Sequence, residues 1–500
     1  MPFEADITQE QKAVLEAKGD IIVVAGPGTG KTFTLLLKLR DLLEQGISPE
    51  RILILTFSLK TSLELKERLS RLRIFGPKID TFHGLAYDLY RELYQKEPVL
   101  IEERDKISLL KKLFPGEKNP LKRDAQRLQY LNYLEKNGLL DFDLLLKKTS
   151  SCVEQGAFRG YYLFIDEFQD LSPEILEFLE PFKESTWILF GDPNQSIYGF
   201  KGVDLERIQR FLKRYKPALK TLSLTHSFRC KEEIVKRANQ FKASPWEIPD
   251  FKTDQPGGLV QGFLFPDTYE EKDFLINLVQ NILGGTSLER ARPSEISPSD
   301  IFILTRIKRI TEPLHEAFQK AGLPVALPEE EAQILKEEIG QFIERVKVAK
   351  NPLPKAMEEV SPLLKNILQN WRELFERDAE KFIFYLEGLS SEDLIFPKLE
   401  GINFLTIHAS KGLEAEVVIL YGADEGLIPF TLLKDYNLLE EKRILYVALT
   451  RAKTNFYFTA SKERRVFNYT LNRGLSPWLK DLPCKEFRKR PPQPKQRSLF

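Results

Sequence analysis

The 500-residue chain has few of the residues that build disulfide frameworks or zinc clusters, with only three cysteines and four histidines. Cys152, Cys230 and Cys484 lie far apart, which excludes a CxxC metal site and a disulfide framework. So few, widely spaced cysteines are typical of a reducing compartment, and we expect a cytoplasmic protein.

Long apolar runs and an excess of one charge are also missing. No apolar run approaches the ~20 residues that cross a bilayer, so we expect no membrane segment. The acidic residues 1–6 lack a signal-peptide pattern. Lys plus Arg number 74 and Asp plus Glu number 73. This balance excludes a uniformly basic coat for nucleic acid, but it allows a local basic groove.

The chain does contain short apolar runs that alternate with helical segments, over a length that predicts roughly two to four domains. The runs show no polar alternation, which is typical of parallel strands covered on both faces. The predicted strands are 21–25, 52–56, 161–165, 186–190, 301–305 and 417–421, and the clearest predicted helices are 31–45, 59–72 and 173–182. This order predicts an α/β fold with parallel sheets.

Three stretches depart from this rhythm. Residues 86–149 and 331–400 have helical periodicity without a buried-strand run, so we interpret both as helical insertions. Residues 481–500 are rich in proline and basic side chains, which predicts a disordered basic tail.

A glycine-rich turn follows the first predicted strand and precedes a helix. It reads Ala25-Gly26-Pro27-Gly28-Thr29-Gly30-Lys31-Thr32, the P-loop arrangement in which backbone N–H groups and a helix N-terminus hold phosphates. Lys31 would reach the β- and γ-phosphates of ATP, and Thr32 would bind Mg²⁺. Upstream, Gln11 could hydrogen-bond the adenine edge through its amide.

A cluster of polar residues follows the strand predicted at 161–165. Asp166 and Glu167 would lie at the ligand-binding edge of an open sheet. There Asp166 would hold Mg²⁺ through water, and Glu167 would orient and deprotonate the attacking water. An acidic helix cap would explain Asp170, but not the whole cluster.

Two segments together indicate a family. Asp166-Glu167-Phe168-Gln169-Asp170 and Gly191-Asp192-Pro193-Asn194-Gln195-Ser196-Ile197-Tyr198-Gly199-Phe200 resemble the UvrD/Rep/PcrA-like DNA helicases of superfamily 1. The resemblance extends from about Ile7 to Ala460. It implies two RecA-like P-loop motor domains with helical insertions, ATP and Mg²⁺ bound between the domains, and 3′-to-5′ movement on DNA.

The resemblance also implies domain boundaries. The first motor domain would comprise 1–85 and 150–215, with a helical insertion at 86–149. The second would comprise 216–330 and 401–480, with a reduced helical insertion at 331–400. We expect a monomer or weak dimer that acts on single-stranded and partly duplex DNA.

The nucleotide roles follow from the same resemblance. Gln195 would sense the γ-phosphate, Phe228 would stack on adenine, and Glu414 would lie near the ribose. The implied catalytic residues are Lys31, Glu167, Gln195, Arg229 and Arg451. The implied nucleotide contacts are Gln11, Ala25, Gly26, Pro27, Gly28, Thr29, Gly30, Lys31, Thr32, Phe228, Arg229, Gly412, Glu414 and Arg451, and the Mg²⁺ ligands are Thr32 and Asp166.

The DNA contacts implied by the resemblance lie on several loops. They are Thr56, Phe57, Thr81, Phe82, His83, Tyr198, Phe200 and His408, and Lys411 would lie near DNA or phosphate. Exposed aromatic rings stack on bases without reading sequence. For Phe57 and Phe82, burial in the core is an equally good interpretation.

The chain is short for this family, and the shortfall lies in the two insertions. Strand separation is therefore less firmly predicted than translocation. Three functions remain open, namely a helicase, a translocase that strips proteins with little unwinding, and a scaffold that uses nucleotide as a switch. The Asp166-Glu167 pair and two arginine fingers argue against the switch.

The chain ends in Gln496-Arg497-Ser498-Leu499-Phe500, which resembles the peptide that binds bacterial sliding clamps, with Arg497 in place of a leucine. Leu499 and Phe500 form an apolar pair in a charged tail, which favours insertion into a partner's pocket, while Gln496 and Ser498 supply polar contacts. The alternative is a basic arm that contacts DNA.

Overall fold

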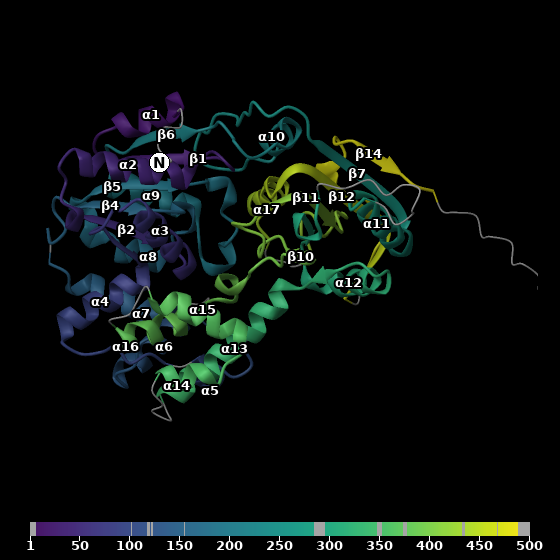
Figure 1. Cartoon of the computed structure of the whole chain (residues 1–500). Coiled ribbons are helices and arrows are strands. Elements are labelled where there is room, and N and C mark those ends of the chain that lie inside the picture. The colour runs from purple at the N-terminus through teal and green to yellow at the C-terminus, as the bar shows by residue number, and fades with distance from the viewer. Residues whose placement is uncertain are drawn as a thin grey trace, which may run out of the picture.

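Two α/β domains, each built on a mostly parallel sheet, lie side by side in the computed structural model (Figure 1), as the sequence predicts. The structure describes residues 7–488 except 102, 118–120, 122–123, 155, 285–295, 348–352, 374–377, 433–435 and 468. Within this part, no helix is long and apolar enough to cross a membrane.

In the first sheet β1 lies between β5 and the edge strand β6, so the P-loop follows a strand that is paired on both sides. The strand order is β3-β2-β4-β5-β1-β6, and every pairing is parallel. Parallel strands place their carboxyl ends at one edge, where the functional loops gather. The strands are β1 Ile21–Ala25, β2 Ile52–Thr56, β3 Lys78–Thr81, β4 Tyr162–Ile165, β5 Thr186–Gly191 and β6 Lys220–Leu224.

Helices cover both faces of this sheet, and four more form the first insertion. Ser58, Thr81 and Asp141 each cap a helix by accepting a bond from a backbone N–H. The covering helices are α1 Gln9–Glu16, α2 Lys31–Glu44, α3 Leu59–Arg71, α8 Pro173–Phe178 and α9 Leu205–Tyr215. Those of the insertion are α4 Phe82–Tyr94, α5 Glu103–Leu113, α6 Asp124–Lys136 and α7 Phe142–Cys152.

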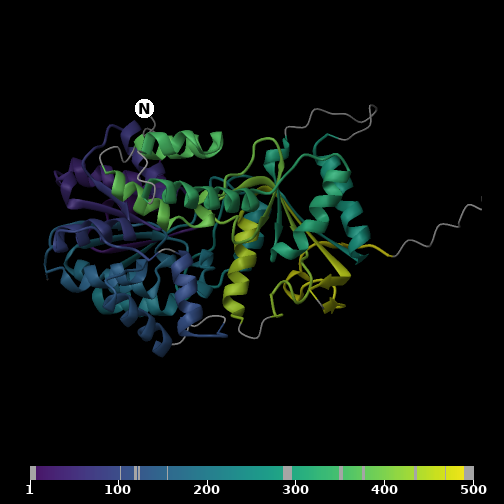
Figure 2. The same cartoon turned by 90° about the horizontal axis from the view of Figure 1, so that it is seen from below.

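The second sheet follows the order β14-β7-β12-β11-β8-β10-β9, with β13 antiparallel to β12. Its strands are β7 Leu259–Asp267, β8 Ile301–Thr305, β9 Val325–Ala326, β10 Ile402–Thr406, β11 Ala415–Tyr421, β12 Ala452–Val466, β13 Tyr469–Leu471 and β14 Cys484–Glu486. The helices packed with them are α10 Glu232–Asn239, α11 Thr268–Ile282, α12 Thr311–Lys320 and α17 Leu438–Thr450. Helix α17 stands between the two domains in Figure 2.

The second insertion leaves the second domain but packs against the first. Its helices are α13 Pro328–Lys347, α14 Leu353–Glu358, α15 Pro362–Glu373 and α16 Ala379–Gly388. On α16, the ring of Phe384 lies 4.4 Å from that of Tyr87 and 5.4 Å from that of Phe142. Lys381 Nζ lies 2.9 Å from Asp80 Oδ2 and 2.6 Å from Asp88 Oδ2. The insertion therefore bridges the two motor domains, as both views show.

Two predicted boundaries need correction. The first domain continues past residue 215, because β6 pairs in parallel with β1. The ordered chain also continues past 481, since β14 pairs with β7 and the ring of Phe487 stacks on that of Phe265 at 4.8 Å. Both strands are short, polar sheet edges, so they lack the apolar run that predicts a buried strand.

The remaining differences are small. The helix predicted at 173–182 ends at Phe178, and a 3₁₀ helix follows at Glu180–Glu184. Helices α4 and α13 begin at residues 82 and 328, before the insertions predicted at 86 and 331. The segment 496–500 lies outside the described residues.

Candidate nucleotide and DNA site

The turn after β1 has the backbone that a phosphate cradle needs. Gly28 and Gly30 have φ of 71° and 78°, a left-handed conformation that favours glycine. A Cβ on Gly28 would overlap the side chain of Arg229, which comes from the segment leading into the second domain. Gly30 is followed directly by α2, whose N-terminus favours an anion. The predicted P-loop therefore runs from the last residue of β1 through the glycine turn to the first two residues of α2.

Lys31 joins this turn to the acidic strand end. Its Nζ lies 3.0 Å from Asp166 Oδ1 and also contacts Glu167. Burial lowers the pKa of Lys31, but the two carboxylates outweigh it and hold that pKa above its ordinary value. Burial opposes ionisation of Glu167 as well, yet Lys31 and Lys411 lower its pKa to about 2. Glu167 is therefore a carboxylate at neutral pH.

The donor chemistry fits Mg²⁺. Asp166 is 3% exposed and begins the turn after β4, and Thr32 lies on the first turn of α2. A carboxylate and a hydroxyl beside a phosphate cradle are the hard oxygen ligands that Mg²⁺ takes, with the rest from phosphate and water. No group of three or more His, Cys, Asp or Glu side chains in the described residues could hold a metal by itself.

A cavity of about 670 Å³ opens beside the glycine turn. Phe228 on its wall is 49% exposed, so its ring face is open to a stacking partner. Arg229 Nε lies 2.7 Å from Glu414 Oε2, which places the predicted finger and the predicted ribose contact together. The cavity is lined by Gly28, Gly30, Phe228, Arg229, Lys231, Gln255, Glu414, Glu416, Lys453 and Thr454.

Gln11 also lies at this turn, but its amide is engaged. A Cβ on Gly30 would meet Gln11 Nε2 at 3.3 Å. Gln11 Oε1 accepts from the Thr8 N–H at 2.9 Å, and Nε2 donates to Thr34 Oγ1 at 3.3 Å. The first bond belongs to the cap of α1 and the second joins α1 to α2, so adenine recognition by Gln11 stays a prediction.

Arg451 reaches from the second domain to the predicted γ-phosphate sensor. It is 2% exposed, and its Nη2 donates to Gln195 Oε1 at 3.2 Å. Gln195 Nε2 in turn donates to Asp192 Oδ2, which also accepts from the Tyr446 hydroxyl at 3.0 Å. Burial and the nearby Arg229 lower the pKa of Arg451 to about 10, so it stays charged at neutral pH.

Sequence analysis missed Asp192 and Tyr446. Asp192 follows β5 at the same sheet edge as Asp166, so its position after a buried strand is a signal that could have identified it. Tyr446 lies in the middle of an apolar helix, where its sequence context is that of a core residue.

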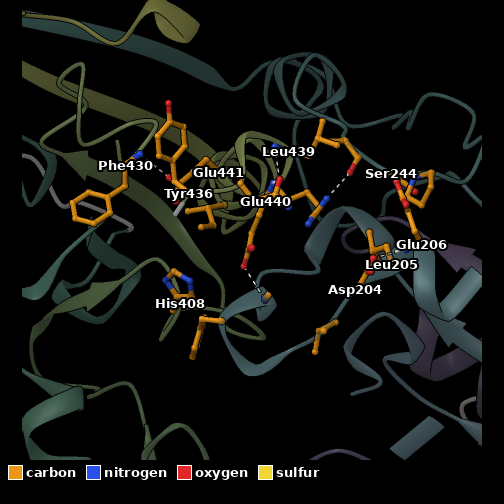
Figure 3. Close-up of a pocket in the computed structure, with 18 of the residues that line it drawn as sticks. Asp204, Leu205, Glu206, Ser244, His408, Phe430, Tyr436, Leu439, Glu440 and Glu441 are labelled. Atoms are coloured by element: carbon orange, nitrogen blue, oxygen red, sulfur yellow. Dashed lines mark hydrogen bonds between the residues drawn. The ribbon is translucent and has the colours of Figure 1, made fainter. Parts of the chain in front are cut away.

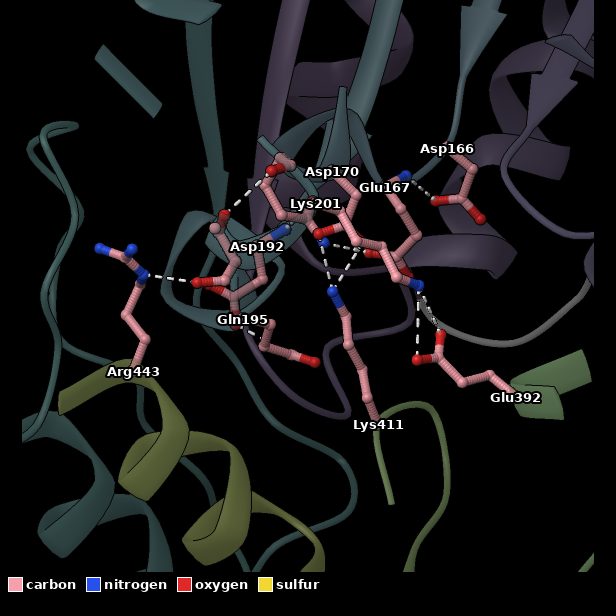
Figure 4. A network of polar contacts seen from close by, with 12 residues as sticks. Asp166, Glu167, Asp170, Asp192, Gln195, Lys201, Glu392, Lys411 and Arg443 are labelled. Atoms are coloured by element: carbon pink, nitrogen blue, oxygen red, sulfur yellow. Dashed lines mark hydrogen bonds and ion pairs between the residues drawn. The ribbon is translucent and has the colours of Figure 1, made fainter. Parts of the chain in front are cut away.

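A second contact between the domains joins Lys411 to Asp170 (Figure 4). Lys411 Nζ lies 2.8 and 2.6 Å from the two carboxylate oxygens, and both side chains are nearly buried. Burial raises the pKa of Asp170 to about 6 despite this partner. Lys411 and Lys201 each place Nζ 4.4 Å from the ring centroid of Tyr198, which lies between them. The two domains are thus tied together beside the nucleotide site.

An exposed aromatic ring, Phe200, lies two residues after Tyr198. Phe200 is 59% exposed, and the ring of His408 lies edge-on to it at 5.8 Å. Burial lowers the pKa of His408 to about 4, so the imidazole is neutral at neutral pH. A base can stack on Phe200 here without electrostatic selection by His408.

Comparison with known proteins agrees with this geometry. A family model of the UvrD/REP helicase N-terminal domain matches residues 7–129 and 105–216, and one of the UvrD-like helicase C-terminal domain matches residues 357–463. The chain belongs to the UvrD/REP helicase family.

Two relatives within this helicase family illustrate the extent of the similarity. The ATP-dependent DNA helicase PcrA of Staphylococcus aureus is 24% identical over 651 aligned positions, covering 95% of this chain and 86% of the relative. A probable DNA helicase II homolog of Rickettsia felis is 24% identical over 640 positions, covering 95% of each. Both alignments exceed the 500 residues of this chain, so it lacks segments that these relatives have.

The UvrD-like segments after β2 and β3 are less open than expected. Phe82 is 1% exposed and packs edge-on to Phe57 at 5.1 Å, so the predicted base stacking is wrong for Phe82 and its ring belongs to the core. Thr56 is 1% exposed and donates to the Ser58 carbonyl, while Thr81 caps α4. Phe57 is half-buried, so its contact with DNA stays a prediction.

His83 gives a pH-dependent prediction. Burial lowers its pKa to about 4, and its ring packs edge-on to Phe142 at 5.2 Å. The unfolded chain takes up this proton near pH 6.5, so stability should fall as the pH drops from about 6.5 to 4. His83→Gln should make that loss shallower by about 1 kcal/mol per pH unit. Thermal unfolding midpoints measured from pH 7 to 4.5 check this, and an unchanged slope in the variant would contradict it.

Proposed function

We propose that this helicase-family member is an ATP-driven motor that moves 3′ to 5′ along single-stranded DNA and separates strands ahead of it. One observation carries the proposal. The glycine turn that precedes Lys31 lines one cavity with Arg229, Lys31 contacts Glu167, and the second domain's Arg451 bonds to Gln195 of the first. Residues from both domains are thus available to one polyphosphate, so that hydrolysis and domain closure are coupled.

Different residues of the chain would have different roles in ATP hydrolysis. The backbone of the glycine turn and Lys31 would hold the phosphates, and Glu167 would orient the attacking water and accept its proton. Arg229 and Arg451 would stabilise the charge of the transferring phosphoryl group. Bound Mg²⁺, held by Thr32 and Asp166, would supply electrostatic stabilisation of the phosphate oxygens. Gln195, which accepts from Arg451, belongs to the same segment of the first domain that leads into Phe200.

A translocase that strips proteins with little unwinding is a second candidate, and the docked insertion favours it. Phe384 is 4% exposed within the first domain's core, and Lys381 bridges Asp80 and Asp88. The face of α16 that makes these contacts is covered by the first domain and is not free to engage duplex DNA. The nucleotide-switch alternative is disfavoured by the complete set of catalytic groups.

We also propose a setting. The protein would work as a monomer or weak dimer in DNA repair, replication or recombination, in the cytoplasm, where its three free cysteines would stay reduced. The C-terminal peptide, Gln496, Ser498, Leu499 and Phe500, would bind a sliding clamp.

Glu167→Gln tests the chemistry. The variant should bind ATP and DNA like the wild type but lose at least about 100-fold in DNA-stimulated ATPase rate, because no carboxylate accepts the proton from water. Steady-state ATPase with and without single-stranded DNA, paired with nucleotide affinity, measures this. Near-normal turnover would exclude Glu167 as the base. Slow wild-type turnover that DNA does not stimulate would instead support a nucleotide switch.

The direction of movement and the separation of strands are tested on duplexes that carry a single-stranded 3′ or 5′ tail. We expect displacement of a strand whose partner offers a 3′ single-stranded tail, and none from a 5′ tail. On a tail blocked by a bound protein, the blocking protein should be released. Release of the protein without strand displacement would favour the stripping translocase, and movement from a 5′ tail would contradict the proposed polarity.

Deletion of residues 496–500 tests the tail. The truncated protein should no longer bind the host's sliding clamp, while its ATPase rate and affinity for single-stranded DNA stay nearly unchanged, because none of these five residues is a proposed nucleotide or DNA contact. Binding to immobilised clamp and fluorescence anisotropy with DNA measure the two properties. If DNA affinity falls and the full-length chain shows no clamp binding, the tail is only a basic arm.

A further inference from the structure

Helix α17 contacts one continuous segment of the first domain along most of its length. That segment, residues 192–199, begins after β5 and leads into Phe200. The contacting side chains are Glu440, Arg443 and Tyr446, which follow one another at three-residue spacing on α17, and Arg451, which caps the end of the helix. Helix and segment run in opposite directions, so the start of the helix lies at the end of the segment.

Two of these contacts, those of Arg451 and Tyr446, lie toward the nucleotide site, and a third, that of Arg443, lies beside the cavity that Glu440 also lines. Arg451 donates to Gln195 Oε1 at 3.2 Å, and the Tyr446 hydroxyl donates to Asp192 Oδ2 at 3.0 Å. Arg443 is 8% exposed, and its Nε donates to the Ser196 carbonyl at 2.6 Å. All three are buried, so they fix the helix firmly to the segment.

The fourth contact lies beside the exposed aromatic ring. The backbone N–H of Gly199 donates to Glu440 Oε1 at 2.8 Å. Figure 3 shows Glu440 reaching away from its helix across a cavity of about 980 Å³, with this bond drawn as a dashed line. A Cβ on Gly199 would overlap the Glu440 carboxylate, so an alanine at this position would displace that carboxylate. Gly199 directly precedes Phe200.

We propose that Glu440 is a positioning residue that makes Phe200 follow the arginine finger. An α-helix is stiff, and the eleven-residue rise from Glu440 to Arg451 spans about 16 Å. When Arg451 shifts with the state of the nucleotide, α17 shifts as one body, and Glu440 moves the backbone of Gly199 and hence the ring of Phe200. The contact between Arg451 and Gln195 would respond to the state of the nucleotide. The contact between Glu440 and Gly199 would pass the resulting shift of α17 to the ring of Phe200. This inference rests on the proposed translocation.

Glu440→Ala should separate ATP hydrolysis from movement along DNA. Its DNA-stimulated ATPase rate should stay within about twofold of wild type, while the translocation rate falls at least about fivefold, so that more ATP is used per nucleotide travelled. Glu440→Gln keeps an oxygen that accepts the Gly199 N–H, so it should retain most of the coupling. Lys442→Ala, half-buried on the same helix, is the matched control and should behave like wild type.

Gly199→Ala breaks the same contact from the other side. It should reproduce the Glu440→Ala defect, and the double variant should be no worse than either single one, because the contact is already lost. Stopped-flow translocation on end-labelled oligonucleotides and ATPase on the same DNA give both quantities. Additive defects in the double variant would overturn the proposal, as would a Glu440→Gln variant as impaired as Glu440→Ala.

Two results separate this inference from the proposed function. If the wild type hydrolyses ATP but does not move on DNA, the proposed function fails and the inference fails with it. If the wild type moves and Glu440→Ala uses no more ATP per nucleotide than wild type, the inference alone fails. A structural defect would lower ATPase and translocation in proportion, and that result would also overturn it.

Discussion

A buried arginine between two domains is the constraint on which the rest of this structure depends. Arg451 donates to the carbonyls of Val447 and Leu413, to the Thr450 hydroxyl and to Gln195. Within the described residues, these hydrogen bonds all go to neutral oxygens. A buried charge without a bonded counter-ion is costly, so the site favours an anion such as a polyphosphate. Because only one of its bonds crosses the cleft, the arginine is held by its own domain and can move with it.

Charge is arranged in complementary ways on the two sides of the cleft. The first domain supplies a compact cluster in which Lys31 is shared by Asp166 and Glu167. The second reaches across with Lys411, whose amino group is bound by Asp170. The short lysine–carboxylate distances offset part of the cost of burying these charges, although burial still raises the pKa of Asp170. They also make the relative position of the domains sensitive to any anion that competes for the lysines.

The second insertion connects the two motor domains. Its α16 helix belongs in sequence to the second domain, yet Phe384 packs in the first domain's core. Since the insertion bridges both motor domains, any closure of the nucleotide cleft must bend or shift this bridge. In the proposed coupling, the same movement of the cleft is transmitted along α17. The second insertion and α17 are therefore both displaced when the cleft closes.

The sequence by itself determined the local elements and the chemistry they carry. Residues 21–32 form strand, turn and helix from adjacent positions, and apolar runs such as 52–56 and 301–305 match their strands to the residue. Edge strands β6 and β14 have no such run, because one side of each meets solvent. Only the tertiary structure decided that Phe82 is buried, that Lys411 pairs with Asp170, and that Glu440 binds the backbone of Gly199. Each of those depends on contacts between segments that are distant in the sequence. A local pattern of side chains does not indicate which distant segment will pack against it.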